Sequence, residues 1–162
     1  MLGSESIDVK GDIDDEKIVE KEIAEMLTAE TGNPFVMSPD RQFYEYDFRL
    51  DTRHLDSPFF EIRYEVKDDK AGITSGNVAI EYKNGKNISG IFASQSDFYI
   101  IIIGRVVYII PRNAILYEIF RMLCHEREKV RIVNGGDYGK SRMFLLPIST
   151  IKEMAIKVMY RK

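Results

Sequence analysis

The chain has 162 residues, of which 44 % are hydrophobic and 30 % are charged, as in an ordinary globular protein of one domain. One cysteine and two histidines exclude an intrachain disulfide, disfavour a zinc site and favour a reducing, cytoplasmic compartment. The most apolar stretch, residues 98–110, is too short to span a membrane and contains Arg105, so we expect no membrane partner.

Charge is unevenly distributed along the chain. Residues 1–110 carry 12 Lys or Arg and 21 Asp or Glu, whereas residues 111–162 carry 11 and 5. A chain with this distribution can bind a polyanion through its C-terminal part. Simple variation of surface charge gives the same pattern, so the charge alone does not identify a nucleic-acid partner.

The N-terminal segment predicts an arm followed by a helix. Residues 1–13 lack hydrophobic periodicity and are interpreted as a flexible arm ahead of a single domain, residues 14–162. A helix is predicted from Asp14 or Asp15, whose carboxylates can cap free N–H groups, to about Glu30. Gly32 then ends the helix.

Alternating and continuous apolar runs predict two kinds of strand. Phe43–Leu50, Phe59–Lys67 and Val78–Lys83 alternate apolar and polar residues, which predicts half-buried strands that are neighbours in one partly antiparallel sheet. Phe98–Ile103 and Val106–Ile110 are apolar throughout and are joined by a glycine turn. They predict a hairpin that is covered on both faces.

The C-terminal third predicts a helix, a hairpin and a last helix. The first helix spans about Asn113–Glu128, and Val130–Val133 and Met143–Leu146 form the hairpin. The last helix begins at Ser149 or Thr150 and ends near Tyr160. Helices and strands in this order indicate a mixed α/β domain.

Charged residues of the first two predicted strands form a candidate site. Asp47 lies within the first strand, and Glu65 and Lys67 lie at the end of the second, where a spacing of two places them on one face. If the strands pair, two carboxylates and an ammonium group converge. Carboxylates bind Mg²⁺, and an ammonium group stabilises charge on a reacting phosphate. The alternation is equally typical of a solvent-facing side, so the residues leave both interpretations open.

Glu22 adds a third carboxylate. It follows Val19 by three residues and precedes Met26 by four, which places it on the apolar side of the first helix. A carboxylate on that side needs a partner, and a metal ion is one. Glu20 and Glu25 are predicted to be ordinary solvated charges.

These elements carry a family resemblance. A helix with Glu22, a strand with Asp47 and a strand ending in Glu65-Val66-Lys67 resemble the core of the PD-(D/E)XK nucleases. Residues 74–82, TSGNVAIEY, are similar to a signature of a phage- and virus-encoded branch of that superfamily, and Ser89-Gly90-Ile91 and Asp97 also match it. The hairpin at residues 98–110 is similar in placement to one in archaeal-type Holliday-junction resolvases. The resemblance covers about residues 16–120.

The resemblance implies a fold, a reaction and partners. The fold would be a restriction-endonuclease-like mixed β-sheet flanked by helices, and the function that of a Mg²⁺-dependent endonuclease, with Mn²⁺ as a substitute. Catalysis would rest on Lys67, Glu65 and Asp47, and the metal on Asp47, Glu65, Glu22 and Glu81. The substrate would be branched or duplex DNA, with a Holliday junction favoured, cut by a homodimer in the cytoplasm of a prokaryotic host if the chain is phage- or virus-encoded.

Two alternatives stay open at this point. One is a restriction- or repair-type nuclease acting on another DNA structure, and the other is a non-catalytic nucleic-acid-binding module. The motif itself also has a rival, because Glu81-Tyr82-Lys83 repeats the E-x-K pattern. Glu65 and Lys67 are favoured because one short connection joins them to the Asp47 strand.

Lysines and arginines near the candidate site are expected to hold the DNA backbone. They flank the predicted site strands or border the glycine-rich turn near residue 136, and they are Lys70, Lys83, Lys86, Lys140 and Arg142. Contacts of this kind release counterions and carry little sequence information. The competing interpretation of Lys140 and Arg142 is that they only keep a surface turn soluble.

Overall fold

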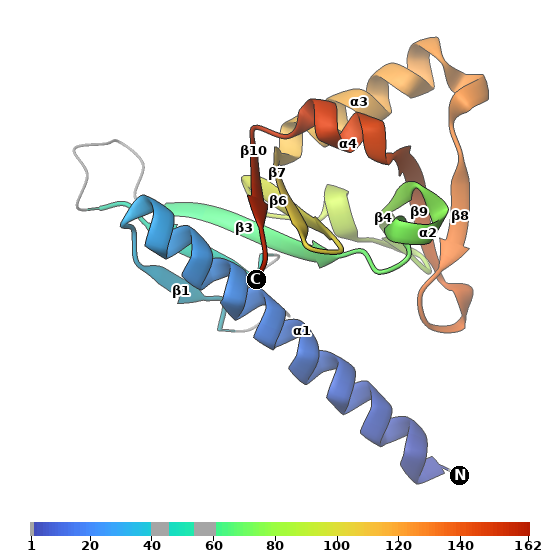
Figure 1. Ribbon diagram of the computed structural model, residues 1–162. Coiled ribbons are helices and arrows are strands. Elements are labelled where there is room, and N and C mark those ends of the chain that lie inside the picture. Colours follow the sequence, from blue (N-terminus) through green and yellow to red (C-terminus); the bar gives the residue numbers. More distant parts are fainter. Residues whose placement is uncertain (1, 40–45, 54–60) are drawn as a thin grey trace. The chain divides into compact units, whose positions relative to one another are not determined.

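The computed structural model describes residues 2–39, 46–53 and 61–162 and contains helices and strands of both pairing types (Figure 1). The predicted mixed α/β class is therefore confirmed. The chain divides into two compact units, residues 1–63 and 64–162. Within the described ranges, no helix has the length and apolar character needed to cross a membrane.

The first unit consists of a long helix and short strands. Helix α1 spans Leu2–Thr31, strand β1 spans Phe35–Met37 and strand β2 spans Phe48–Asp51. β1 pairs antiparallel with β2, and α1 lies against both strands. The part of the predicted first strand at residues 43–45 and the part of the second at residues 59 and 60 lie outside the described residues.

Helix α1 begins well before the expected cap. The sequence predicts an arm through residue 13, but helical backbone starts at Leu2. No proline interrupts residues 2–13, and adding residues to an existing helix costs far less than starting one. The C-terminal end is as expected, because the Gly32 N–H donates to the Thr28 carbonyl and Gly32 adopts a φ of +75°.

The second unit contains four neighbouring strands of a mixed sheet, called here the first sheet. Their order is β3-β6-β7-β10, in which β3 spans Glu61–Asp68 and starts in the first unit, β6 spans Phe98–Ile103, β7 spans Val106–Pro111 and β10 spans Lys157–Tyr160. β3 is parallel to β6, and the other pairs are antiparallel. The predicted β6–β7 hairpin is confirmed, and neighbouring residues such as Ile100 and Ile101 are both fully buried, as expected for strands covered on both faces.

A second, antiparallel sheet lies in the same unit. Its order is β5-β4-β9-β8, with β4 at Asn77–Asn84, β5 at Asn87–Ile88, β8 at Ile132–Gly135 and β9 at Ser141–Pro147. The predicted pairing of the segments around residues 132 and 144 is confirmed. The prediction that Val78–Lys83 shares a sheet with the two preceding strands is wrong, because β4 pairs along its whole length with β9, from a distant part of the sequence.

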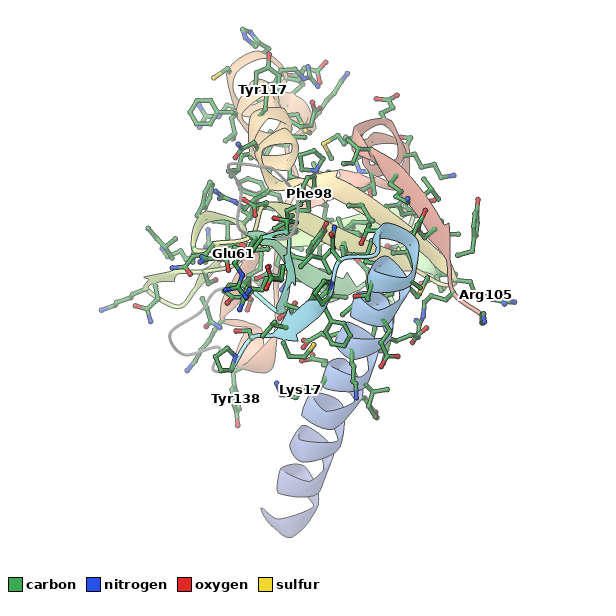
Figure 2. The ribbon with its side chains drawn as sticks, turned by 90° about the vertical axis from the view of Figure 1, so that its left-hand side faces the viewer. Lys17, Glu61, Phe98, Arg105, Tyr117 and Tyr138 are labelled. Carbon is green, nitrogen blue, oxygen red and sulfur yellow. The ribbon has the colours of Figure 1, made fainter. Side chains whose placement is uncertain are left out.

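The core of the second unit lies between the sheets and the helices. Tyr99, Ile101 and Ile110 of the first sheet belong to one buried cluster with Val78 and Phe144 of the second. Helix α3, at Arg112–His125, adds the residues of its inner side to this cluster, whereas its outer side includes the exposed Tyr117 (Figure 2). The core therefore fixes the first sheet against the second.

Two short helices complete the second unit, α2 at Gly72–Ser75 and α4 at Ile148–Met154. The prediction of a helix continuing to about Tyr160 is wrong. Ala155 adopts extended backbone, and residues 157–160 pair with β7 as strand β10. Their alternation of half-buried and exposed side chains fits the edge of a sheet.

Candidate functional site

Glu65 and Lys67 form the centre of the candidate site on β3. The pairing of β3 with β6 is regular here, with Glu65 opposite Tyr99 and Lys67 opposite Ile101, so both side chains belong to one face. The Lys67 Nζ lies 3.6 Å from the Glu65 Oε2. The Glu65 side chain is 3 % exposed and that of Lys67 38 %, so a buried carboxylate has an accessible ammonium group beside it.

A buried tyrosine hydroxyl lies beside Glu65. The hydroxyl of Tyr99 lies near Glu65 and Ser94 but makes no hydrogen bond of ordinary geometry within the described part of the chain. Burial raises the pKa of Tyr99 far above its usual range, and the charge of Glu65 raises it further. The tyrosine therefore stays protonated and holds a hydrogen that it can direct at the carboxylate.

The segment before β6 is held by serines and an arginine. The hydroxyl groups of Ser94 and Ser96 lie 2.6 Å apart, and both side chains are buried. Arg112 donates from Nε to the Ser96 carbonyl at 3.0 Å and from Nη1 to the Ile91 carbonyl at 3.2 Å. These bonds hold the segment whose Ser94 lies near the Tyr99 hydroxyl, a polar neighbourhood that the sequence pattern did not indicate.

The carboxylate of Glu65 has the character of a cation ligand. Its Oε2 is buried and accepts no hydrogen bond from the described residues, with the Lys67 ammonium as its ionic neighbour. An oxygen of this kind suits Mg²⁺, which protein sites hold through one or two carboxylates together with water and substrate phosphates. No group of three or more His, Cys, Asp or Glu in the described ranges is arranged to hold a metal by itself.

Two of the other predicted acids, Asp47 and Glu22, belong to the first unit. Asp47 is 2 % exposed and directly precedes β2. Glu22 is half-buried on α1, whereas Glu20, predicted to be solvated, is 5 % exposed. The buried side of α1 therefore follows Glu20, Ile23, Ala24 and Leu27, a spacing of three, four and seven residues that could have identified Glu20 from the sequence.

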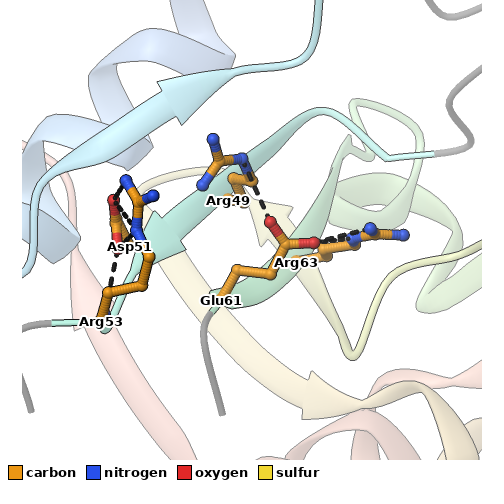
Figure 3. Close-up of polar contacts among 5 residues, drawn as sticks. All are labelled: Arg49, Asp51, Arg53, Glu61 and Arg63. Atoms are coloured by element: carbon orange, nitrogen blue, oxygen red, sulfur yellow. Dashed lines mark hydrogen bonds and ion pairs between the residues drawn. The ribbon is translucent and has the colours of Figure 1, made fainter.

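A second polar group of the first unit joins β2 to the start of β3 (Figure 3). Glu61 accepts from Arg49 Nε at 3.3 Å and from Arg63 Nη2 at 2.6 Å. Arg53 forms a two-pronged pair with Asp51, and these hydrogen bonds lower the pKa of Asp51 to about 2. Three arginines thus gather around two carboxylates, an arrangement that the alternating strand pattern did not distinguish from a solvated face.

Glu81 is engaged within the second sheet. Its Oε1 accepts from the Ser141 hydroxyl at 2.5 Å, and its Oε2 accepts from the Ser89 hydroxyl at 3.0 Å. The register shifts after Glu81, which lies opposite Met143, so that Lys83 lies opposite Arg142. Because Met143 and Arg142 are consecutive and face opposite ways, the bulge places Glu81 and Lys83 on opposite faces of the sheet.

Four of the five predicted DNA-binding residues meet at one end of the second sheet. Lys83 and Arg142 are cross-strand neighbours, the Gly85 N–H donates to the Lys140 carbonyl at 3.0 Å, and Lys86 lies in the β4–β5 turn. We call Lys83, Lys86, Lys140 and Arg142 the basic end. All four are exposed, and none forms an ion pair with a described residue.

Lys70 lies apart from the basic end. It follows Asp69, whose Oδ1 accepts from the Gly72 N–H at 2.7 Å and whose Oδ2 accepts from the Ala79 N–H at 3.2 Å. Ala79 lies near the start of β4, about 13 Å along the strand from Lys83 at 3.3 Å per residue. Lys70 would therefore meet a different part of a long ligand.

Comparisons of the chain with models of protein families, with curated proteins and with solved structures gave no match.

Proposed function

We propose that this chain is a metal-dependent DNA endonuclease with a restriction-endonuclease-like fold and that Glu65 and Lys67 act in the cleavage. The observation that carries the proposal is the pair itself, a buried carboxylate oxygen without a hydrogen bond from the described residues, 3.6 Å from an accessible ammonium group. Burial of a charged carboxylate costs free energy unless a partner compensates it. A lysine and a divalent cation are partners that also serve phosphate chemistry.

The roles follow from where the two groups lie. Glu65 would hold Mg²⁺ through its buried oxygen, and the ion when bound would polarise a phosphoryl oxygen and supply water of lowered pKa. Lys67, at the exposed edge, would place its ammonium group against the charge that develops on the phosphate. Tyr99 would direct its hydrogen at Glu65 and fix the orientation of the carboxylate.

The geometry favours the first E-x-K motif over the second. Glu65 and Lys67 share a face because the register of β3 with β6 is unbroken, whereas the bulge separates Glu81 from Lys83. Both oxygens of Glu81 also accept serine hydroxyl groups. A metal role of Glu81 stays a prediction, as do those of Asp47 and Glu22.

The basic end supports DNA as the substrate. Its four exposed cations lie on strands and turns that a backbone phosphate can approach. No ion pair between these cations and a described residue has to break when DNA binds. Such contacts recognise backbone geometry and not base sequence, which suits a structure-specific enzyme. We propose a four-way junction as the preferred substrate and a homodimer as the acting form, because closed two-fold symmetry matches two equivalent cuts.

The test compares wild type with Glu65→Gln. We expect wild type to cut a four-way junction with Mg²⁺ or Mn²⁺ and not with EDTA, and to cut it faster than duplex or single-stranded DNA. The variant should bind the junction in Ca²⁺ as wild type does and should not cut. Cleavage by Glu65→Gln at the wild-type rate, or by wild type in EDTA, would contradict the proposal.

A further inference from the structure

Tyr138 is exposed at the tip of the β8–β9 hairpin. It is 93 % exposed, and Figure 2 shows it projecting from the ribbon. Its φ of +60° and ψ of +21° lie in the left-handed region, and no other described non-glycine residue has a positive φ. This conformation costs roughly 1–2 kcal/mol for a residue with a side chain, so the hairpin holds a large ring outward in spite of the backbone conformation.

The base of this hairpin is firmly held. Ser141, the first residue of β9, pairs with Gly135 and is 4 % exposed. Its hydroxyl donates to Glu81 on β4, and a side chain at Gly136 would place Cβ 2.6 Å from the Ser141 Oγ. The Gly139 N–H closes the tip on the Gly136 carbonyl at 3.3 Å. The tip is therefore a defined turn carried by an anchored strand pair.

A lysine of the basic end lies beside the ring. The Lys140 Nζ lies 5.9 Å from the centre of the Tyr138 ring, and Lys140 belongs to the basic end. Glu81, the acid on the adjacent strand β4, accepts hydrogen bonds from two serines. An exposed aromatic ring beside a lysine of the basic end combines a stacking surface for a base with a binding group for its phosphate.

We propose that Tyr138 stacks on an unpaired or unstacked base of branched DNA while the basic end binds the adjacent backbone. The inference rests on the proposed function, because it takes DNA as the substrate, and adds the residue that selects the DNA structure. Bases in continuous duplex are stacked on both sides and offer no free face. A branch point offers a free base face. Tyr138 would therefore distinguish branched DNA from continuous duplex by stacking and not by base sequence.

The experiment measures binding in Ca²⁺ of a four-way junction and of a duplex of equal length. Tyr138→Asn removes the ring and tolerates the left-handed backbone, and Tyr138→Phe retains the ring. We expect Tyr138→Asn to weaken junction binding by about 5- to 100-fold, the range of one lost stacking contact, with duplex binding unchanged. Tyr138→Phe should stay within about threefold of wild type for both, since stacking needs only the ring.

A fluorescent base analogue at the branch point supplies a second readout. Wild type and Tyr138→Phe should change its emission on binding, and Tyr138→Asn should not. Equal loss on both DNAs, or no loss on either, would overturn the inference while leaving the nuclease proposal intact. Selective loss of junction binding in a chain that does not cut DNA with any metal would support the inference and overturn the nuclease.

Discussion

Glu81 and Lys83 lie on opposite faces of the second sheet, although only Tyr82 separates them in the sequence. In a regular strand the two residues would share a face, as Glu65 and Lys67 do on β3. One extra residue on β4 therefore decides which of two identical motifs can bring a carboxylate and an ammonium group to one phosphate.

The first prediction compares the two lysines. Lys67→Met keeps the length of the side chain and removes its charge, and we expect cleavage under single-turnover conditions to slow by at least about 100-fold, or about 2.7 kcal/mol. Lys83→Met should leave this rate within about threefold once the DNA is saturating, because the role proposed for Lys83 is contact with the DNA backbone only. The rates of purified variants on a labelled junction check the ranking. The opposite order would move the site to Glu81 and Lys83.

The second prediction separates the two helix acids. Glu20 is buried, so Glu20→Gln should reduce the free energy of unfolding by about 1–3 kcal/mol through loss of its polar contacts. Glu22→Gln should leave stability unchanged and should raise the Mg²⁺ concentration needed for half-maximal cleavage. Urea unfolding and metal titration check these outcomes separately. A Glu22→Gln variant that is silent in both assays would identify Glu22 as a solvated helix charge.

The third prediction concerns the basic end. Lys140→Ala combined with Arg142→Ala should lower the slope of log affinity against log salt by about 2 and weaken all sequences alike, because two phosphate contacts are lost. Lys152→Ala on α4 is the matched control, since it removes an exposed cation elsewhere. Junction binding in Ca²⁺ across a salt series provides the measurement. An unchanged slope in the double variant would exclude these residues from the DNA interface.

The fourth prediction concerns alkaline pH. Burial, with the charge of Asp97 adding to it, raises the pKa of Tyr64 to about 12. The unfolded chain therefore loses this proton first, and the free energy of unfolding should fall between about pH 10 and pH 12, by up to about 1.4 kcal/mol per pH unit from this group. Tyr64→Phe should remove its share of that slope. Urea unfolding between pH 8 and 11.5 checks the difference, and identical slopes would contradict it.

The sequence predicts an element most reliably where its pattern of apolar residues fits only one secondary structure. The run from Phe98 to Ile110 is apolar throughout except at Gly104-Arg105, and only a hairpin buried on both faces satisfies it, with Gly104 at a φ of +64°. The helix around Ile115 and Ile119 was equally distinct. Both elements formed close to the predicted boundaries.

The predictions are wrong where the residue pattern fits more than one pairing strand, element type or helix face. The alternation at residues 78–83 correctly predicts a strand, but alternation does not specify which strand pairs with it. The partner is β9, which lies more than fifty residues later in the sequence. The predicted last helix runs too far because its start at Ser149 or Thr150 does not fix its end, and residues 157–160 form strand β10. Glu20 is buried although the sequence predicts a solvated charge, because the buried side of the helix follows Glu20, Ile23 and Leu27, whereas Val19 and Met26 are only half-buried.

Asp69 connects the strand that would cut DNA to the strand that would hold it. Its two oxygens accept hydrogen bonds from the backbone of Gly72 and Ala79, so this carboxylate adds to the core packing that sets the offset between β3 and β4. If the basic end binds the DNA backbone and cleavage takes place at Glu65, this offset determines how far the cleaved phosphate lies from the bound ones. For the proposed nuclease, loosening this offset would broaden the distribution of product lengths before it slowed the reaction, so the accuracy and the rate of cleavage would depend on different residues.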